Sequence, residues 1–133
     1  MDTIIQQAKD AMARAYAPYS GFFVGAALRC ADGRVFTGCN IENASYGATN
    51  CAERTAFFKA VSEGCREFTD LAICGGKAGE ITDFCPPCGI CRQVISEFCG
   101  EDFQIHLIGP RDAVRTLTLG ELLPGSFTAA SME

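Results

Sequence analysis

Three cysteines and one glutamate have the types and spacing of a metal site that does chemistry. Cys51-Ala52-Glu53 places a carboxylate two residues after a thiol, and Pro87-Cys88-Gly89-Ile90-Cys91 supplies two further thiols. A structural zinc site takes four protein ligands, whereas a catalytic site takes three and keeps its fourth position for water. We therefore predict one Zn2+, held by Cys51, Cys88 and Cys91, that activates water. Glu53 is the expected proton carrier.

The three thiols are expected at the beginnings of two helices. Cys51 lies at the start of a predicted helix that runs from residue 50 or 51 to residue 63, and Cys88 and Cys91 lie at the start of that of residues 88–99. Unpaired backbone N–H groups and the helix dipole stabilise negative sulfur there. Three thiolates and one Zn2+ leave a negative site, so nearby cations would stabilise it. Arg54 and Arg92 are the available cations, and we expect both to hydrogen-bond the sulfurs.

A second C-x-x-C pattern overlaps the first, because Cys85 and Cys88 enclose two prolines. Proline has no N–H to solvate a thiolate, whereas both residues between Cys88 and Cys91 have one. Cys88 and Cys91 are therefore favoured as the ligands. If Cys85 joined them and Cys51, the site would be closed and structural. A redox dithiol of Cys85 and Cys88 is a further alternative.

Several candidate residues also have simpler explanations. Glu53, judged alone, would fit a capping box with Asn50 as the N-cap, but it follows a predicted zinc ligand. His106, the only histidine, lies in an alternating strand pattern and is expected to be structural. The other cysteines are expected to be small buried or loop residues. They are Cys30, Cys39, Cys65, Cys74 and Cys99.

Hydrophobic periodicity and turn residues predict the elements that position these groups. A first helix begins near residue 4 and stops before Pro18, and two later helices cover residues 51–63 and 88–99. Strands are predicted at residues 23–30, 34–38, 68–74, 104–108 and 115–119, with a loop at 39–49 and a short helical tail at 121–123. Helices interleaved with strands indicate a layered α/β domain with one sheet between helices. We expect the later strands to run parallel, joined by crossover connections.

Length, charge and cysteine content limit the class of protein. The chain has 133 residues, so we expect residues 1–133 to form a single domain. A net charge of -5 and the lack of a basic cluster argue against a nucleic-acid partner. The longest apolar run, residues 22–28, is too short to span a membrane, and no secretory signal is visible. The nine cysteines are then expected to be thiols and metal ligands, which places the protein in the cytoplasm.

Motifs along almost the whole chain closely resemble those of the small cytidine deaminases, in the same order. They are APYS with F-x-V-G-A (17–26), GCNIENA (38–44), CAERTA (51–56), PCGICRQ (87–93) and ELLPGSF (121–127). The resemblance implies a three-layer α/β/α sandwich around a five-stranded mixed sheet. It also implies a homotetramer in which each active site is built from more than one subunit.

The same resemblance implies hydrolytic deamination of cytidine and 2′-deoxycytidine to uridine and 2′-deoxyuridine, with release of ammonia, in pyrimidine salvage. Zinc-activated water attacks C4 of the base, and Glu53 matches the proton shuttle. Asn40 and Glu42 match residues that hold the ribose hydroxyls, and Phe22 matches an aromatic beside the base. The remaining matches are the main chain of Ala44 and Ala52, which contacts the pyrimidine, and Phe127, a C-terminal aromatic that reaches into a neighbour's site.

Other functions are also compatible with parts of this pattern. A deaminase of a cytosine nucleoside analogue, such as blasticidin S, has similar zinc motifs, although Asn40-Ile41-Glu42 favours an ordinary ribose. A non-enzymatic zinc or redox module would need a fourth sulfur ligand, for which Cys85 is the candidate. A deaminase acting on nucleic acid is disfavoured by the acidic charge and the lack of tryptophan. Tyr46 is a candidate for either a substrate contact or a subunit contact.

Overall fold

Helices and strands alternate along the computed structural model, which describes residues 2–133. The helices are α1 (Asp2–Met12), α2 (Ala52–Ser62), α3 (Gly89–Phe98) and α4 (Leu119–Leu122). The strands are β1 (Phe22–Cys30), β2 (Val35–Cys39), β3 (Phe68–Lys77), β4 (Gln104–Ile108) and β5 (Val114–Thr118). Short 3₁₀ turns lie at Tyr46–Ala48, Pro110–Asp112 and Ala129–Met132. None of the helices in this described part is both long and apolar enough to cross a membrane.

The predicted helices and strands are found, with some shifted ends. β3 differs most, because its predicted end was Cys74 and the strand continues to Lys77. Gly75 and Gly76 have little intrinsic preference for a strand. They are held in one because the neighbouring strand β1 pairs with them over its whole length. The first helix ends at Met12, a few residues earlier than expected.

The five strands form one mixed sheet in the order β2-β1-β3-β4-β5. β1 pairs antiparallel with β2 and with β3, and β3 pairs parallel with β4 through the crossover helix α3. The expectation that all the later strands run parallel is wrong for β5, which pairs antiparallel with β4. A parallel pair needs a crossover of a dozen or more residues. The connection from Ile108 to Val114 is too short for one and turns the chain back.

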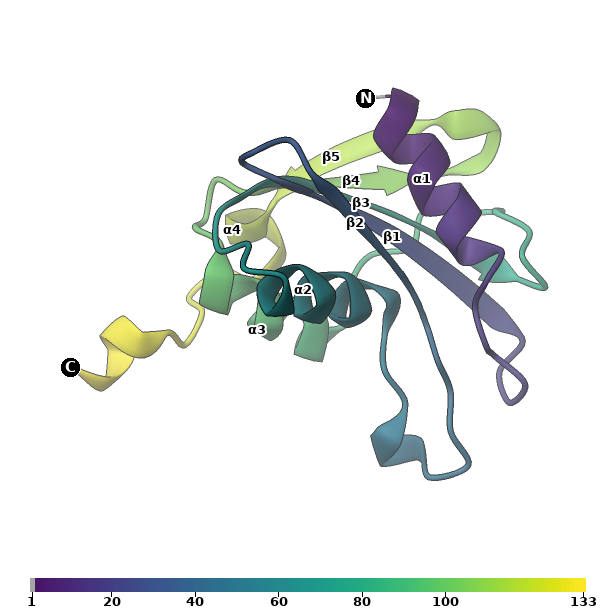
Figure 1. Ribbon diagram of the computed structural model, residues 1–133, viewed down its shortest axis with the longest axis horizontal. Coiled ribbons are helices and arrows are strands. Elements are labelled where there is room, and N and C mark those ends of the chain that lie inside the picture. Colours follow the sequence, from purple (N-terminus) through teal and green to yellow (C-terminus); the bar gives the residue numbers. More distant parts are fainter. Residues whose placement is uncertain (1) are drawn as a thin grey trace.

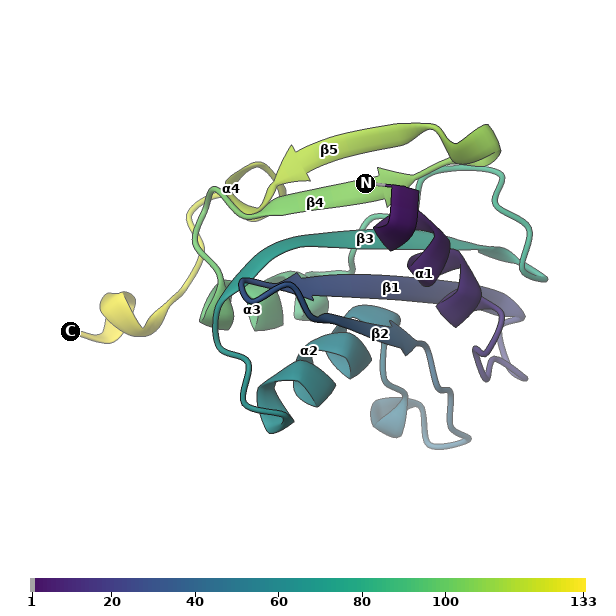
Figure 2. The ribbon, with the colours of Figure 1, turned by 45° about the horizontal axis from the view of Figure 1, so that its top comes forward.

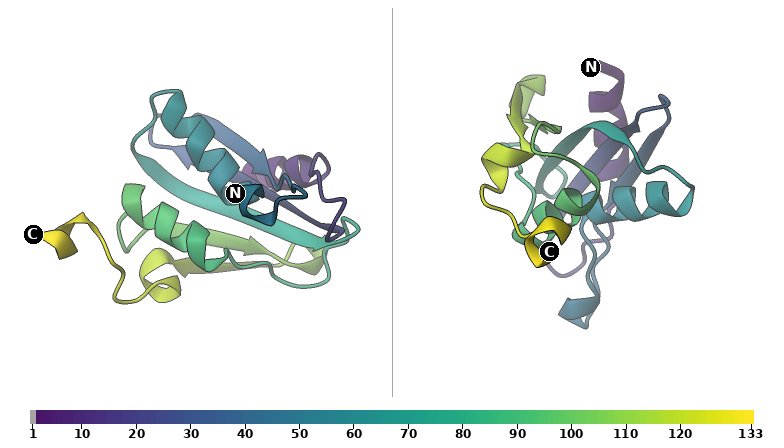
Figure 3. Two further views of the ribbon diagram at one scale, coloured as in Figure 1. Left: turned by 90° about the horizontal axis from the view of Figure 1, so that it is seen from below. Right: turned by 90° about the vertical axis from the view of Figure 1, so that its left-hand side faces the viewer.

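Helices cover both faces of this sheet (Figures 1 and 2). α1 packs on one face, where its apolar residues meet Ala27, Ala72 and Ile108. α2 and α3 lie side by side on the opposite face (Figure 3), and the two helices are in contact. The α/β/α sandwich with a five-stranded mixed sheet, expected from the family resemblance, is therefore confirmed.

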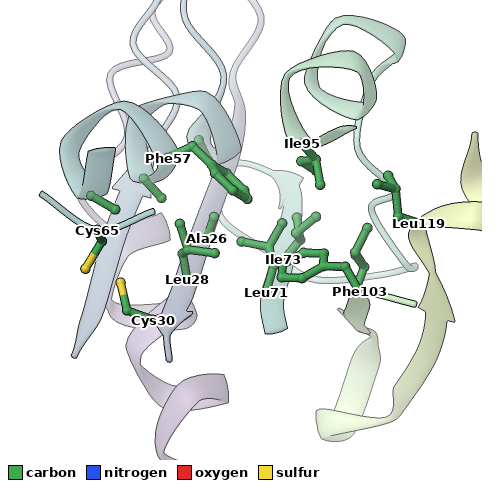
Figure 4. Close-up of a cluster of buried hydrophobic side chains, with 14 of the residues drawn as sticks. Ala26, Leu28, Cys30, Phe57, Cys65, Leu71, Ile73, Ile95, Phe103 and Leu119 are labelled. Carbon is green, nitrogen blue, oxygen red and sulfur yellow. The ribbon is translucent and has the colours of Figure 1, made fainter. Parts of the chain in front are cut away.

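The middle strands are apolar on both faces, as is usual for strands covered by helices on both sides. In β1, Ala26 and Leu28 belong to the core under α2 and α3, whereas Ala27 belongs to the core under α1. The larger core centres on Phe57 of α2 (Figure 4). Its ring centroid lies 5.1 Å from that of Phe68. This packing holds α2 against the sheet and so fixes the position of its first residues.

A glycine permits the close approach of α2 to the sheet. A Cβ atom at Gly38 of β2 would lie 2.3 Å from the carbonyl oxygen of Ala52 and 2.6 Å from the backbone nitrogen of Ala56. Neither backbone atom can move aside without moving the helix. Because Ala52 stands between Cys51 and Glu53, this contact sets where those two candidate residues lie.

We expect Gly38→Ala to lower the free energy of unfolding by about 1–3 kcal/mol and to weaken zinc retention. The added methyl group would push the start of α2 away from β2 and separate Cys51 from the thiols of α3. Urea unfolding and a parallel zinc assay measure the two effects. Gly100→Ala is a suitable control, because nothing lies within 4 Å of a Cβ atom there. Equal stability and zinc content in both variants would contradict this packing role.

Candidate active site

The three predicted ligands converge at the beginnings of α2 and α3. Cys51 is the N-cap of α2, Cys88 is the N-cap of α3, and Cys91 lies in the first turn of α3. The Cys51 and Cys88 sulfurs are 3.7 Å apart, and those of Cys88 and Cys91 are 3.4 Å apart. All three lie within 4.8 Å of one another. Tetrahedral zinc with Zn–S bonds of about 2.3 Å separates its sulfurs by about 3.8 Å, so the group fits one zinc ion.

The surroundings of Cys51 favour its thiolate. Hydrogen bonding to Cys91 contributes most to lowering the pKa of the Cys51 thiol to about 5, and Arg54 and Cys88 contribute further. Burial acts in the opposite direction. A metal binds the thiolate and not the thiol, so this environment favours ligation by Cys51, whereas the same hydrogen bond raises the pKa of the Cys91 thiol.

The two predicted arginine contacts differ in outcome. Arg54 donates a hydrogen bond from Nη2 to the Cys51 sulfur at 3.1 Å, as expected. Arg92 instead donates to the carbonyl oxygens of Pro87 and Leu122, at 2.8 and 2.7 Å. Within residues 2–133 its hydrogen bonds thus go to backbone and not to sulfur, which corrects the expectation for Arg92. Arg92 thereby connects the loop before Cys88 to the end of α4.

Glu53 is a buried carboxyl in the first turn of α2, with 4% of its surface exposed. Burial is the main cause that raises the pKa of this carboxyl to about 7. The capping-box explanation is wrong, because the N-cap of α2 is Cys51 and the Asn50 amide donates to Thr55. The carboxyl is therefore available to a bound molecule, and it can gain or lose a proton near neutral pH.

Glu53 opens into a cavity of about 260 Å³ beside the thiols. Its lining combines the metal-site residues Cys51 and Cys88 with residues of β1 and of the loop that follows β2. The predicted site residues that line it are Phe22, Asn40, Glu42, Cys51, Ala52, Glu53 and Cys88. A second cavity of about 320 Å³, lined by Tyr19 and Tyr46, shares Ser20, Glu42 and Thr49 with the first. The smaller cavity is the reactive one, because only it contains the thiols and Glu53.

Two of the polar side chains on the cavity wall, those of Asn40 and Glu42, also organise the backbone around it. The amide of Asn40 accepts a hydrogen bond from the N–H of Val24 at 2.9 Å and donates to the carbonyl oxygen of Phe22 at 2.8 Å. Glu42 accepts bonds from the N–H groups of Tyr19 and Ser20, both at 3.0 Å, and from the Ser20 hydroxyl. The Ser20 bonds lower the pKa of the Glu42 carboxyl.

These contacts leave hydrogen-bonding capacity for a bound molecule. The Asn40 amide has two N–H donors, of which the bond to Phe22 uses one. The Glu42 carboxylate can accept about four hydrogen bonds, and its contacts with Tyr19 and Ser20 use three. Asn40 and Glu42 can therefore both hold the segment from Tyr19 to Val24 and bind hydroxyl groups in the cavity.

Residues 1–107 match the family model described as the cytidine and deoxycytidylate deaminase zinc-binding region. The chain belongs to the cytidine deaminase family. A cytidine deaminase from Sporosarcina psychrophila is 48% identical over 128 residues, which are 96% of this chain and 91% of that protein. One from Halalkalibacterium halodurans is 50% identical over 129 residues, which are 97% of this chain and 95% of that protein.

Solved structures agree with this family membership. The crystal structure of cytidine deaminase from Burkholderia pseudomallei matches with a TM-score of 0.87 and 48% identity, over 95% of this chain and 98% of that chain. The resemblance to cytidine deaminases inferred from the sequence motifs is confirmed. Zinc is accordingly the cofactor of this family's domain, and the three sulfurs described above are the group that could hold it.

Two residues that the family resemblance placed near the substrate lie outside the cavity of this chain. Among residues 2–133, neither Ala44 nor Phe127 contributes to the cavity lining. Ala44 is exposed in the loop after β2. Phe127 is 60% exposed, in the C-terminal segment that extends away from the sheet (Figure 1). Its carbonyl oxygen accepts a hydrogen bond from Gln93 at 2.8 Å, so the segment is attached to α3.

Cys85 lines the cavity although it was not among the predicted site residues. Across residues 2–133, the sulfur cluster of the site comprises Cys51, Cys88 and Cys91 without Cys85. Burial raises the pKa of the Cys85 thiol to about 12. This arrangement favours an open site with three sulfurs over a closed one with four. The indication in the sequence that Cys85 lies near the site was that it stands directly before the two prolines that precede Cys88.

His106 agrees with its expected structural role. It is buried, with Nε2 at 2.9 Å from a carboxylate oxygen of Asp70 and Nδ1 at 2.8 Å from the Thr116 hydroxyl. These bonds connect β3, β4 and β5. The ring is thus fully engaged within the sheet.

We expect Arg54→Ala to weaken zinc binding about 10- to 100-fold and to lower turnover. The change removes the hydrogen bond to Cys51 and the positive charge that offsets the thiolates. Zinc affinity is measured by competition with a chromogenic chelator. Arg29→Ala serves as a control, because it also removes an arginine charge but lies near the end of β1 that does not line the cavity. Unchanged zinc affinity and turnover in Arg54→Ala would show that the contact has no functional role.

Proposed function

We propose that this chain catalyses the zinc-dependent hydrolytic deamination of cytidine and 2′-deoxycytidine, in pyrimidine salvage. The products are uridine or 2′-deoxyuridine and ammonia. The observation that carries the proposal is the buried Glu53 carboxyl in the same cavity as the sulfurs of the metal site. The two relatives described above are named cytidine deaminases, and this chain matches nearly the full length of each.

The residues of the cavity suit this reaction. Bound zinc would supply activated water for attack at C4 of the cytosine ring. Loss of the amine also needs a proton at N3 and another at the departing amino nitrogen. Glu53 would deliver them in turn, taking each from the attacking water, because its carboxyl is buried beside the metal site and burial raises its pKa to about 7. Cys51, Cys88 and Cys91 would hold the ion and keep its fourth position open.

We assign the orientation of the substrate to residues that line the cavity. Asn40 and Glu42 would bind the ribose hydroxyls with the donor and acceptor positions that their backbone contacts leave free. Phe22, 40% exposed at the cavity, would pack beside the base. The backbone of Ala52, next to Glu53, would contact the pyrimidine ring. A site that pairs with a substrate hydroxyl discriminates strongly against analogues without it.

We infer that the active protein is a homotetramer with shared sites. Phe127 and Tyr46 are 60% and 76% exposed, so both rings are accessible to a neighbouring subunit. Ala44 and Phe127 would then complete the substrate site of a neighbouring subunit, and Tyr46 would lie at a subunit contact. We place this assembly in the cytoplasm, because its cysteines are free thiols. Analytical ultracentrifugation of the zinc-loaded protein tests the assembly.

The function is tested by following ultraviolet absorbance as cytidine is converted to uridine by zinc-loaded protein. Cytidine and 2′-deoxycytidine should both be turned over, and single-stranded oligonucleotides should not. Blasticidin S is the discriminating competitor substrate. Turnover of blasticidin S without turnover of cytidine would assign the chain to an analogue deaminase. No turnover of any of these by zinc-loaded protein would leave a non-enzymatic zinc module.

A further inference from the structure

Two cysteines outside the active site face each other at the ends of β1 and α2. Cys30 is the last residue of β1, and Cys65 follows the glycine that ends α2. Their sulfur atoms point toward one another (Figure 4) and lie within 4.8 Å. Cys30 is 1% exposed and Cys65 is 5% exposed. The sequence predicted both as ordinary small residues, because nothing local relates two positions so far apart.

Backbone hydrogen bonds hold each cysteine in place. The N–H of Cys30 donates to the carbonyl oxygen of Arg34 at 2.8 Å, within the turn between β1 and β2. The N–H of Cys65 donates to the carbonyl oxygen of Ala60 at 2.9 Å, which closes the end of α2. Gly64 has a φ of +95°, which allows this reversal. The two sulfurs are therefore presented to each other by fixed backbone, and a small side-chain movement brings them to bonding distance.

Arg34 and exposure distinguish the two sulfurs. The Nη2 atom of Arg34 donates a hydrogen bond to the Cys65 sulfur at 2.9 Å, and its Nε atom donates to Asp32 at 2.9 Å. Cys65 is 5% exposed and Cys30 is 1% exposed, so Cys65 is the easier of the two to reach. Burial is the main cause that raises the pKa of the Cys30 thiol to about 12. Cys65 is thus placed to attack first, and Cys30 to attack second.

A surface cavity of about 300 Å³ gives small molecules access to the pair. Both cysteines line it, together with Arg34, Arg66 and Glu67. Asp32 also has an oxygen close enough to the two sulfurs for the three groups to hold a metal ion. Arg34 argues against a metal, because its positive guanidinium already contacts both Asp32 and Cys65. A metal would have to displace it.

We propose that Cys30 and Cys65 form a reversible thiol–disulfide site that reacts with low-molecular-weight disulfides. The Cys65 thiolate attacks one sulfur of the small disulfide, whose S–S bond breaks and releases one small thiolate. Cys30 then loses its proton and attacks the Cys65 sulfur of the mixed disulfide, releasing the second small thiolate. The protein dithiol is oxidised, the small disulfide is reduced to two thiols, and an excess of small thiol reverses both steps.

This cross-link would stabilise the fold without reaching the active site. It would join the end of α2 to the turn after β1, whereas Cys51 and Glu53 lie at the opposite end of α2. The closed loop runs from residue 30 to residue 65, and a cross-link across a loop of this size restricts the unfolded chain substantially. Neither consequence depends on which substrate the active site takes.

The test incubates zinc-loaded wild-type protein with oxidised glutathione and then blocks the remaining free thiols. Peptide mapping without reduction should find Cys30 joined to Cys65. The midpoint of thermal unfolding should rise by about 5–10 °C and return to its starting value with excess reduced glutathione. Zinc content should stay unchanged, which shows that the thiols of the metal site were spared.

Variants separate the pair from the other thiols. Cys30→Ala and Cys65→Ala should abolish both the linked peptide and the thermal shift, whereas Cys99→Ala should keep both. Arg34→Gln should slow formation of the link about tenfold without changing its end point. Two wild-type results would each overturn the proposal, even if every variant failed to fold. One is that Cys30 and Cys65 are still blockable thiols after oxidation. The other is a second bound zinc that protects them, which would make the pair a metal site.

Discussion

Glu53→Gln is expected to lower kcat for cytidine by about a thousandfold or more while zinc stays bound. Glutamine keeps the shape of the side chain but cannot release and accept protons at the departing amine and at N3. The wild-type carboxyl is suited to this work because burial raises its pKa to about 7. Zinc should remain because its three proposed ligands are the sulfurs of Cys51, Cys88 and Cys91.

Turnover and zinc content should be measured on the same samples of this variant. Glu63→Gln is the matched control, because it makes the same change at the exposed C-cap of the same helix. It should keep wild-type turnover. Near-normal kcat in Glu53→Gln would remove this residue from the proton-transfer role. Loss of zinc in the same variant would instead indicate that the carboxyl supports the metal site.

Cys91→Ser is expected to abolish stoichiometric zinc binding and, with it, turnover. The Cys91 sulfur is buried and lies 3.4 Å from that of Cys88, so its loss leaves only two sulfurs in the cluster. A serine hydroxyl remains protonated at neutral pH and is a poor replacement for a thiolate. The midpoint of thermal unfolding should also fall, because bound zinc stabilises the native state.

Cys85→Ser is the informative counterpart, because Cys85 belongs to the overlapping C-x-x-C pattern. It should keep both zinc and turnover, since the sulfur cluster within residues 2–133 is formed without Cys85. Zinc is measured by mass spectrometry of the native protein and turnover by ultraviolet absorbance. Zinc loss in Cys85→Ser with zinc retention in Cys91→Ser would reverse the assignment and favour a pair formed by Cys85 and Cys88.

Much of the candidate site was predictable because its signals are local. A carboxylate two residues after Cys51 falls in the first turn of the same helix, and Cys88 and Cys91 are three residues apart on another. Helix starts have recognisable chemistry, so their positions were predicted to within a residue or two. The family resemblance then joined the two segments into one site.

The predictions about β5 and Arg92 were wrong for two separate physical reasons. The direction of β5 depends on the short connection after β4, whose length forbids the crossover that a parallel strand requires. The acceptors of Arg92 are carbonyl oxygens of its own loop and of α4, which no rule of local spacing indicates. The capping box at Glu53, which was disfavoured in the sequence, is also absent from the structure, because Cys51 and not Asn50 is the N-cap.

The sequence by itself determined the ligand types, the adjacent carboxyl, the helices that carry them and the family. Only the tertiary structure decided that Asn40 and Glu42 hold the backbone of the cavity wall, and that Cys30 meets Cys65. The physical reason is the distance along the chain over which each kind of interaction acts. Periodicity, capping and ligand spacing act over a few residues, so they can be read along the chain. Contacts between distant residues depend on how helices pack on the sheet and on close approaches such as that at Gly38.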